Sequence, residues 1–167
     1  MGSKFGTRWK RTRESIEAMK LLWSKGTASY AGELVRFDNL RCEPRPVQES
    51  GPPVILGAHG PKALERVARS YDGWMPLLSN ADDLRREVAV LHKLLKERGR
   101  DMRSIQISPL VDPGESGPSS QELKAWRDAG ADRIILLSQD TVAATAEGKA
   151  HELIRRFAPV VERNRAL

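Results

Sequence analysis

The sequence predicts an α/β fold in which short parallel strands alternate with amphipathic helices. Short apolar runs without polar alternation recur along residues 53–167, which is typical of strands buried on both faces. Each run is followed by a turn and then by apolar residues at helical spacing. The strand–helix units are roughly 25–35 residues long, the length of a right-handed βαβ crossover. Together these observations favour a parallel sheet with covering helices.

The first 52 residues predict a helix, a short hairpin excursion and an irregular crossing. Residues 9–25 carry apolar side chains at helical spacing, and Gly26 lies where a helix C-cap is expected. Residues 27–42 change period and indicate two short extended pieces around Gly32. The crossing that follows is extended because of its prolines, Pro44, Pro46, Pro52 and Pro53.

Residues 53–167 predict four βα units. The expected strands cover residues 53–56, 73–78, 105–111 and 133–137. The expected helices cover residues 61–70, 81–98 and 119–130, and the last begins near Thr145 and is bent or ended by Pro159. Asn80 is a predicted N-cap, and Ser119 with Glu122 forms a capping-box pattern. Four units fit a small doubly wound sheet or part of a (β/α)8 barrel. Because a complete barrel normally needs about 250 residues, we expect a partial barrel in a single domain spanning residues 1–167.

Composition narrows the classes of function. The net charge is +6, but Lys and Arg are interleaved with Asp and Glu along the chain, so we expect no nucleic-acid binding. No apolar run is long enough for a transmembrane helix, so no membrane association is expected. The lone Cys42 has no internal partner for a disulfide, which favours a reducing cytoplasm. The histidines lie far apart in the sequence, so we expect no metal site.

The turn at residues 57–61 carries the most specific chemistry. A short apolar strand ends at Gly57-Ala58-His59-Gly60, and Pro61 opens the next helix. Free backbone N–H groups at such a helix N-terminus favour an anion, usually a phosphate. A tight βα turn without a ligand is the alternative from these residues alone. Ser138 and Gln139, which follow the last strand, are weaker candidates for binding residues.

Several stretches, in order, resemble one known family. They are Arg8, residues 13–16, 21–23, 32–37, 44–48, 52–57, 63–68 and 72–74, and Ala129-Gly130-Ala131-Asp132-Arg133. They resemble the C-terminal half of the luciferase-like monooxygenases, which are oxidoreductases dependent on flavin or on coenzyme F420. The resemblance covers nearly the whole chain and implies part of a TIM barrel, with the N-terminal half of the barrel missing.

The resemblance also implies a cofactor site. The cofactor phosphate is expected at the turn formed by Gly57, Ala58, His59, Gly60 and Pro61. A second wall is expected at the end of the next strand, formed by Leu77, Leu78 and Ser79. Ala58 stands where the family usually has a second glycine. No catalytic residue can be assigned, because no acid–base pair or catalytic triad can be assembled from the sequence, and the cofactor would carry the reaction.

Two functions remain open at this point. The first is an oxidoreductase or monooxygenase that uses reduced F420, or alternatively FMN, on a small organic substrate. The second is a catalytically incomplete half-barrel that binds a phosphorylated ligand or only dimerises. In either case, the expected partner is a second copy of the chain or the missing N-terminal half, because the open edges of a half-barrel sheet invite pairing.

Overall fold

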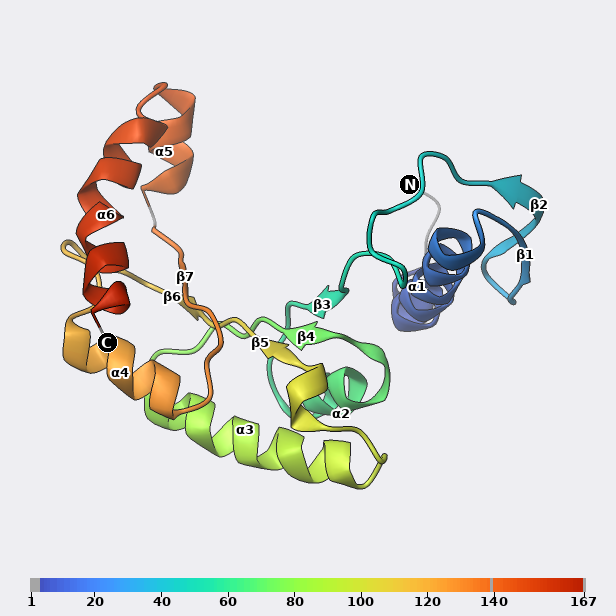
Figure 1. The fold of residues 1–167 in the computed structure, drawn as a ribbon, viewed down its shortest axis with the longest axis horizontal. Helices are drawn as coiled ribbons and strands as arrows, with labels where there is room; N and C mark the ends of the chain where they lie inside the picture. The colour runs from blue at the N-terminus through green and yellow to red at the C-terminus, as the bar shows by residue number, and fades with distance from the viewer. Residues whose placement is uncertain (1–3, 139, 167) are drawn as a thin grey trace. The chain divides into compact units, whose positions relative to one another are not determined.

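The computed structural model describes residues 4–138 and 140–166. The chain forms two compact units, Met1–Val54 and Ile55–Leu167 (Figure 1). The boundary lies two residues beyond the end of the predicted crossing, where the regular βα units begin. The single-domain organisation of residues 1–167 stays a prediction.

The first unit consists of a helix and an antiparallel hairpin. Its elements are η1 (Phe5–Thr7), α1 (Arg8–Lys25), β1 (Thr27–Ala31) and β2 (Arg36–Arg41). Gly26 ends α1 with φ +74°, and its N–H donates to the Leu22 carbonyl at 2.7 Å. The carboxylate of Glu14 is buried and accepts the backbone N–H groups of Leu34 (2.7 Å) and Val35 (3.0 Å). Glu14 therefore ties the hairpin turn to the helix, and the predicted helix and hairpin are confirmed.

The second unit is built on parallel strands. They are β3 (Ile55–Leu56), β4 (Gly73–Trp74), β5 (Gln106–Ile107), β6 (Leu110–Val111) and β7 (Ile135–Leu136). The order β3-β4-β5 forms one sheet, and β6 pairs with β7. A bridge between Leu77 and Leu110 links the two groups, and the Leu110 N–H donates to the Pro76 carbonyl at 2.8 Å. Four lengths of chain thus run side by side in parallel, as predicted.

The predicted strand at residues 105–111 is divided into β5 and β6. Pro109 lies between them and has no N–H to donate to a ladder. The chain still stays hydrogen-bonded across the interruption, because the Ser108 N–H donates to the Trp74 carbonyl (2.9 Å) and the Pro109 carbonyl accepts from Ile135 (3.0 Å). The single predicted strand is therefore kept as a path through the sheet but not as one regular element.

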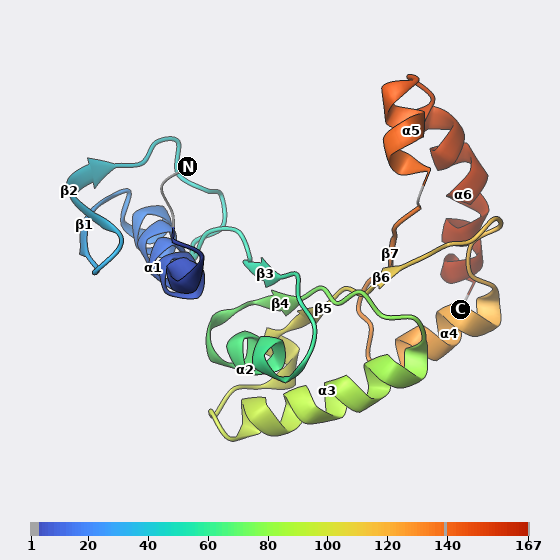
Figure 2. The same cartoon turned by 180° about the vertical axis from the view of Figure 1, so that it is seen from behind.

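The helices of this unit are α2 (Pro61–Ser70), α3 (Ala81–Lys96), α4 (Ser120–Asp128), α5 (Thr141–Ala146) and α6 (Ala150–Arg165), with η2 at Met102–Ser104. Figures 1 and 2 show α2, α3 and α4 in succession along one side of the strands. The final helix begins earlier than predicted and is interrupted near Gly148, which has φ +71°. Pro159 lies inside α6 and does not end it.

Burial differs between the middle row of the parallel sheet and the segments that follow the strands. Leu56, Trp74 and Ile107 share one row and one face, and all three are buried. Leu77 and Leu137, which follow β4 and β7, are exposed apolar residues. Their exposed fractions are 58% and 46%. The middle row of the sheet therefore belongs to the core, whereas apolar side chains just beyond the strands are exposed.

Candidate functional site

The β3–α2 turn has the backbone of an anion site. Gly60 is the N-cap of α2 with φ 87° and ψ 171°, a region that essentially only glycine occupies, and Pro61 follows at the first helical position. The first turn of α2 has no acidic residue and no side-chain cap. Among the described residues, the backbone N–H of Lys62 meets no acceptor. The helix tip thus presents an unpaired donor and the positive end of the helix dipole.

A buried tryptophan fixes the position of this turn. The indole N–H of Trp74 donates to the Ala58 carbonyl at 2.8 Å, and its side chain is fully buried. The Met75 N–H donates to the Leu56 carbonyl at 2.9 Å, immediately before the turn begins. The sequence gives no signal for this hydrogen bond, since the bond depends on where the turn carbonyl points.

The other predicted site residues lie at the same edge of the sheet. Strands β3 and β4 are parallel and in direct register, so the turn after β3 and the segment after β4 leave the sheet on one side. Leu77 and Ser79 are exposed there, as is His59 in the turn itself, and Leu78 is half-buried. Gln139 lies outside the described residues. The assignment of these residues to a cofactor stays a prediction.

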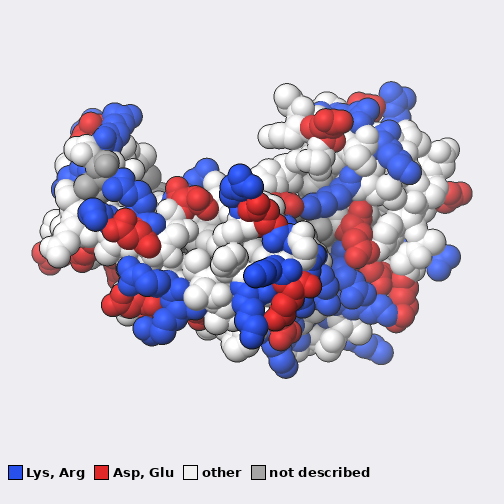
Figure 3. All heavy atoms as spheres, turned by 60° about the horizontal axis from the view of Figure 1, so that its bottom comes forward, with Lys and Arg blue, Asp and Glu red and all other residues white. Residues whose placement is uncertain are grey.

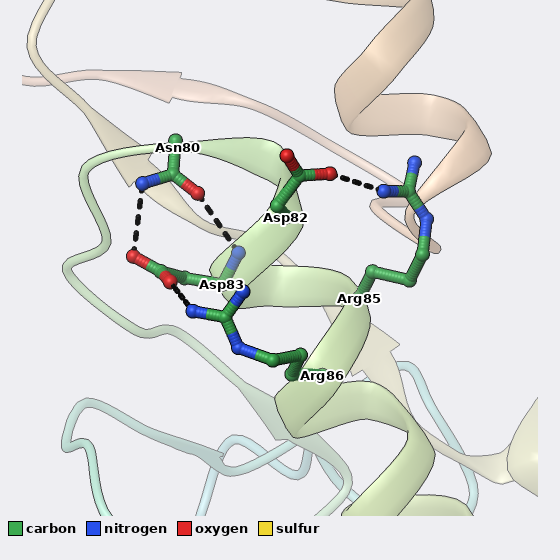
Figure 4. A network of polar contacts seen from close by, with 5 residues as sticks. All are labelled: Asn80, Asp82, Asp83, Arg85 and Arg86. Carbon is green, nitrogen blue, oxygen red and sulfur yellow. Dashed lines mark hydrogen bonds and ion pairs between the residues drawn. The ribbon is translucent and has the colours of Figure 1, made fainter.

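The next helix along the edge has a different N-terminus (Figure 4). The side-chain carbonyl of Asn80 accepts the Asp83 N–H at 2.9 Å, and its amide donates to the Asp83 carboxylate at 3.0 Å. Asp82 and Asp83 also pair with Arg85 and Arg86, respectively. The tip of α3 is thus capped by its own side chains and carries two carboxylates, which disfavours an external anion.

Helix α4 is capped in a similar way. The Ser119 hydroxyl accepts the Glu122 N–H at 3.2 Å, and the Glu122 carboxylate accepts the Ser119 N–H at 2.8 Å, which completes the predicted capping box. The N–H and hydroxyl of Ser119 hold the pKa of Glu122 below its usual value. Among α2, α3 and α4, only α2 begins without a side-chain cap.

A cavity lies elsewhere in this unit. It measures about 360 Å³ and is lined by Leu123, Leu136, Val160 and further residues of α4, α6 and the approach to β7. These include residues 131–134, which precede β7, so the cavity lies toward the amino end of that strand. It is therefore distinct from the carboxyl edge, where parallel βα folds bind ligands.

Surface charge, helix hydrophobicity and possible metal ligands bear on the expectations from composition. On the face drawn in Figure 3, Lys and Arg side chains lie interspersed with Asp and Glu. Within residues 4–138 and 140–166, every helix is too short or too polar to cross a bilayer. Over the same residues, no three His, Cys, Asp or Glu side chains gather closely enough to hold a metal ion. The cytoplasmic location and the lack of nucleic-acid binding stay predictions.

The sequence profile of the luciferase-like monooxygenases matches residues 1–160. The chain belongs to this family. An uncharacterised protein of Mycobacterium tuberculosis is 30% identical over 158 residues, covering 92% of this chain and 52% of that protein. The sulfoquinovose monooxygenase of Agrobacterium fabrum is 25% identical over 148 residues, covering 87% of this chain and 36% of the enzyme. This luciferase-like chain thus spans about half the length, or less, of these relatives.

Solved structures show the same fold. The F420-dependent tetrahydromethanopterin reductase of Methanopyrus kandleri superposes with a TM-score of 0.65 at 14% identity, covering 78% of this chain and 57% of that one. An F420-dependent secondary alcohol dehydrogenase superposes with a TM-score of 0.64 at 15% identity, covering 83% and 58%. Likeness at this identity shows the fold alone, and it confirms the prediction of a partial luciferase-like TIM barrel.

Proposed function

We propose that this chain supplies the phosphate-docking half of a luciferase-like oxidoreductase that uses reduced F420, with FMN as the alternative cofactor, on a small organic substrate. One observation carries the proposal. The tip of α2 is open and uncapped, whereas the neighbouring tips of α3 and α4 are closed by their own side chains. The named relatives support the class of reaction, because they include F420-dependent enzymes and an FMNH2-dependent dimethylsulfone monooxygenase of Pseudomonas putida.

The residues of the turn fit a phosphate. A Cβ built on Gly60 would meet no atom within 4 Å, so the space beside this backbone is open. The Lys62 N–H would donate to a phosphate oxygen, and the exposed Lys62 ammonium would add positive charge nearby. His59, exposed in the same turn, would donate a further hydrogen bond. Trp74 would keep the turn in place through the Ala58 carbonyl. The reduced cofactor, when bound, supplies the hydride or activates oxygen.

The edges of the sheet and the exposed apolar residues beside them indicate that a partner completes the site. Parallel sheets are normally covered on both faces, and Leu77 and Leu137 are exposed apolar residues just beyond the strand ends. Within the part of the chain that the structure describes, β3 and β7 each pair with a strand on one side only. We propose that the other half of the barrel, or a second copy of this chain, pairs with these edges and covers Leu77 and Leu137. Sedimentation analysis of the chain alone and with the N-terminal half of a relative separates these two partners.

The incomplete half-barrel without turnover is the less favoured function, because the relatives whose names state an activity are oxidoreductases. If the chain is part of an oxidoreductase, its substrate and its catalytic group depend partly on residues in the other half of the barrel.

The docking turn can be tested by calorimetric titration of the full chain with F420, FMN and riboflavin. Wild type should bind FMN more tightly than riboflavin, which lacks the phosphate. Gly60→Glu should weaken FMN and F420 at least about 100-fold, a difference of about 2.7 kcal/mol, because it places a carboxylate against the phosphate. Riboflavin should be affected much less.

Gly99→Glu is the matched control. Gly99 also has positive φ (+65°) with no atom within 4 Å of a built Cβ, but it follows the C-terminus of α3. It should therefore add the same charge at a positive-φ glycine far from the turn and keep FMN affinity. Equal FMN affinity in wild type and Gly60→Glu would rule out the turn as the phosphate site.

A further inference from the structure

Helix α6 holds the loop that follows β6. The Arg156 Nε donates to the Glu115 carbonyl at 2.8 Å. Arg163 donates to the carbonyls of Ser116 (3.1 Å) and Pro118 (3.2 Å). Two guanidinium groups of one helix thus bind three successive parts of the loop at residues 112–118.

The loop also touches α6 through its backbone. Gly117 has φ +73°, and a Cβ at this position would lie 2.4 Å from Cγ2 of Val160, which is buried. Only a glycine lets the chain approach α6 so closely in this conformation. The loop is therefore seated on α6 by both polar and apolar contacts.

Arg156 has a second partner on a different loop. Its Nη1 lies 3.2 Å from Oδ2 of Asp140, which follows β7. Strands β6 and β7 are parallel neighbours, so both loops leave the sheet at the carboxyl edge. One guanidinium therefore connects the two adjacent loops that lie on the same edge as the β3–α2 turn.

We propose that Arg156 is a positioning residue that couples the β6–α4 loop to the β7–α5 loop at the rim of the site. Only the assignment of these loops to an active site rests on the proposed function. Active sites of (β/α)8 barrels are built from such loops. The planar guanidinium directs separate N–H groups to Glu115 and Asp140, whereas the compact ammonium of a lysine cannot match this fork. Loss of either arm would release the far loop as well as the near one.

The test is amide hydrogen exchange on the full chain without cofactor. Asp140→Asn removes the charge that orients Arg156 but leaves every contact with residues 112–118 in place. The proposal expects exchange in residues 114–117 to rise about fivefold or more, although Asp140 does not touch them. Arg156→Lys should raise exchange in the same loop, and combining it with Asp140→Asn should add little.

Arg165→Gln is the matched control, because Arg165 pairs on the same helix with the exposed Glu162 at 2.9 Å. It should leave exchange in residues 114–117 unchanged. Unchanged exchange in Asp140→Asn, or a rise spread evenly over the whole unit, would overturn the coupling.

FMN titration of the same variants gives a separate reading. A loss of affinity of about threefold or more in Asp140→Asn, but not in Arg165→Gln, supports a role of the coupling at the site. If Asp140→Asn raises exchange in the loop but leaves FMN affinity unchanged, Arg156 connects the two loops without positioning the site, and its positioning role is wrong. If wild type itself binds neither F420 nor FMN, the proposed function fails, while the exchange result still decides the coupling.

Discussion

Helices α2 and α3 begin at the same edge of the same parallel sheet, yet their N-termini are opposite in character. The tip of α2 has glycine and proline, no acidic residue in its first turn and no side-chain cap. The tip of α3 has an asparagine cap, two aspartates in its first turn and arginines that neutralise them (Figure 4). The dipole of each helix would attract an anion, but of these two tips only that of α2 has neither a side-chain cap nor an acidic residue.

The difference separates a helix tip closed by its own side chains from one left open, where we propose that a phosphate binds. A helix whose first N–H groups are satisfied by its own side chains gains stability from them. A helix that leaves such a group open gives up that gain and keeps a place for a ligand. The buried Trp74 offsets the missing cap of α2, because it holds the turn from the core side.

The largest expected effect comes from removing Trp74. Trp74→Ala should lower the free energy of unfolding by about 3–5 kcal/mol, because it empties a fully buried site. It should also remove the hydrogen bond to the Ala58 carbonyl, so that the turn before α2 is no longer held in place. Urea unfolding measures the first effect, and amide exchange at residues 57–60 measures the second.

Two milder variants separate volume from hydrogen bonding. Trp74→Phe keeps an aromatic ring but removes the indole N–H, so exchange at the turn should rise at a cost of about 1–2 kcal/mol in stability. Trp126→Phe, at another buried tryptophan, should leave exchange at residues 57–60 unchanged. Equal exchange at the turn in wild type and Trp74→Phe would contradict the pinning role of Trp74.

A smaller effect is expected at α3. Asn80→Ala removes the cap and should lower the free energy of unfolding by about 1 kcal/mol. FMN affinity should stay the same, because Asp82 and Asp83 still repel an anion from this tip. Asn164→Ala, at an exposed position near the end of α6, serves as the control. A gain of FMN affinity in Asn80→Ala would contradict the division of roles between α2 and α3.

The smallest effect is a pH dependence at α4. The folded pKa of Glu122 is lowered by hydrogen bonds from Ser119, so the folded state binds a proton less readily than the unfolded state. The stabilisation is therefore complete above the usual glutamate pKa near 4.5 and is lost as the pH falls through the lowered folded value. Thermal unfolding between pH 7 and pH 3 should show a steeper loss of stability in wild type than in Glu122→Gln. Parallel curves would contradict the capping box.

The helix caps were readable from the sequence because they depend on local chemistry. Asn80, and Ser119 with Glu122, occupy positions where their side chains reach N–H groups three residues away. Gly60 with Pro61 was readable for the same reason. Strand lengths were less readable, since a strand is defined by its neighbours. Pro109 breaks a ladder whose partner strands lie tens of residues away.

The contacts by which α6 holds the β6–α4 loop could not be predicted from the sequence. Arg156 and Arg163 reach residues 41–47 positions earlier in the chain. Charged side chains on an exposed helix face carry no signal for such partners. The close approach of Gly117 to Val160 follows from how α6 folds back onto the loop. The predicted cofactor residues share one edge of the sheet. Which ligand they bind is tested by the titrations with F420, FMN and riboflavin.

The buried indole of Trp74 also makes the turn visible to spectroscopy. Its environment is apolar and its N–H is engaged, so its emission should be blue-shifted relative to that of a solvent-exposed tryptophan. A flavin or deazaflavin absorbs in the region where tryptophan emits, so a cofactor seated beside Gly60 would quench this chromophore by energy transfer. Trp74 is thus an internal optical probe whose indole N–H binds the turn at which we propose that a cofactor docks.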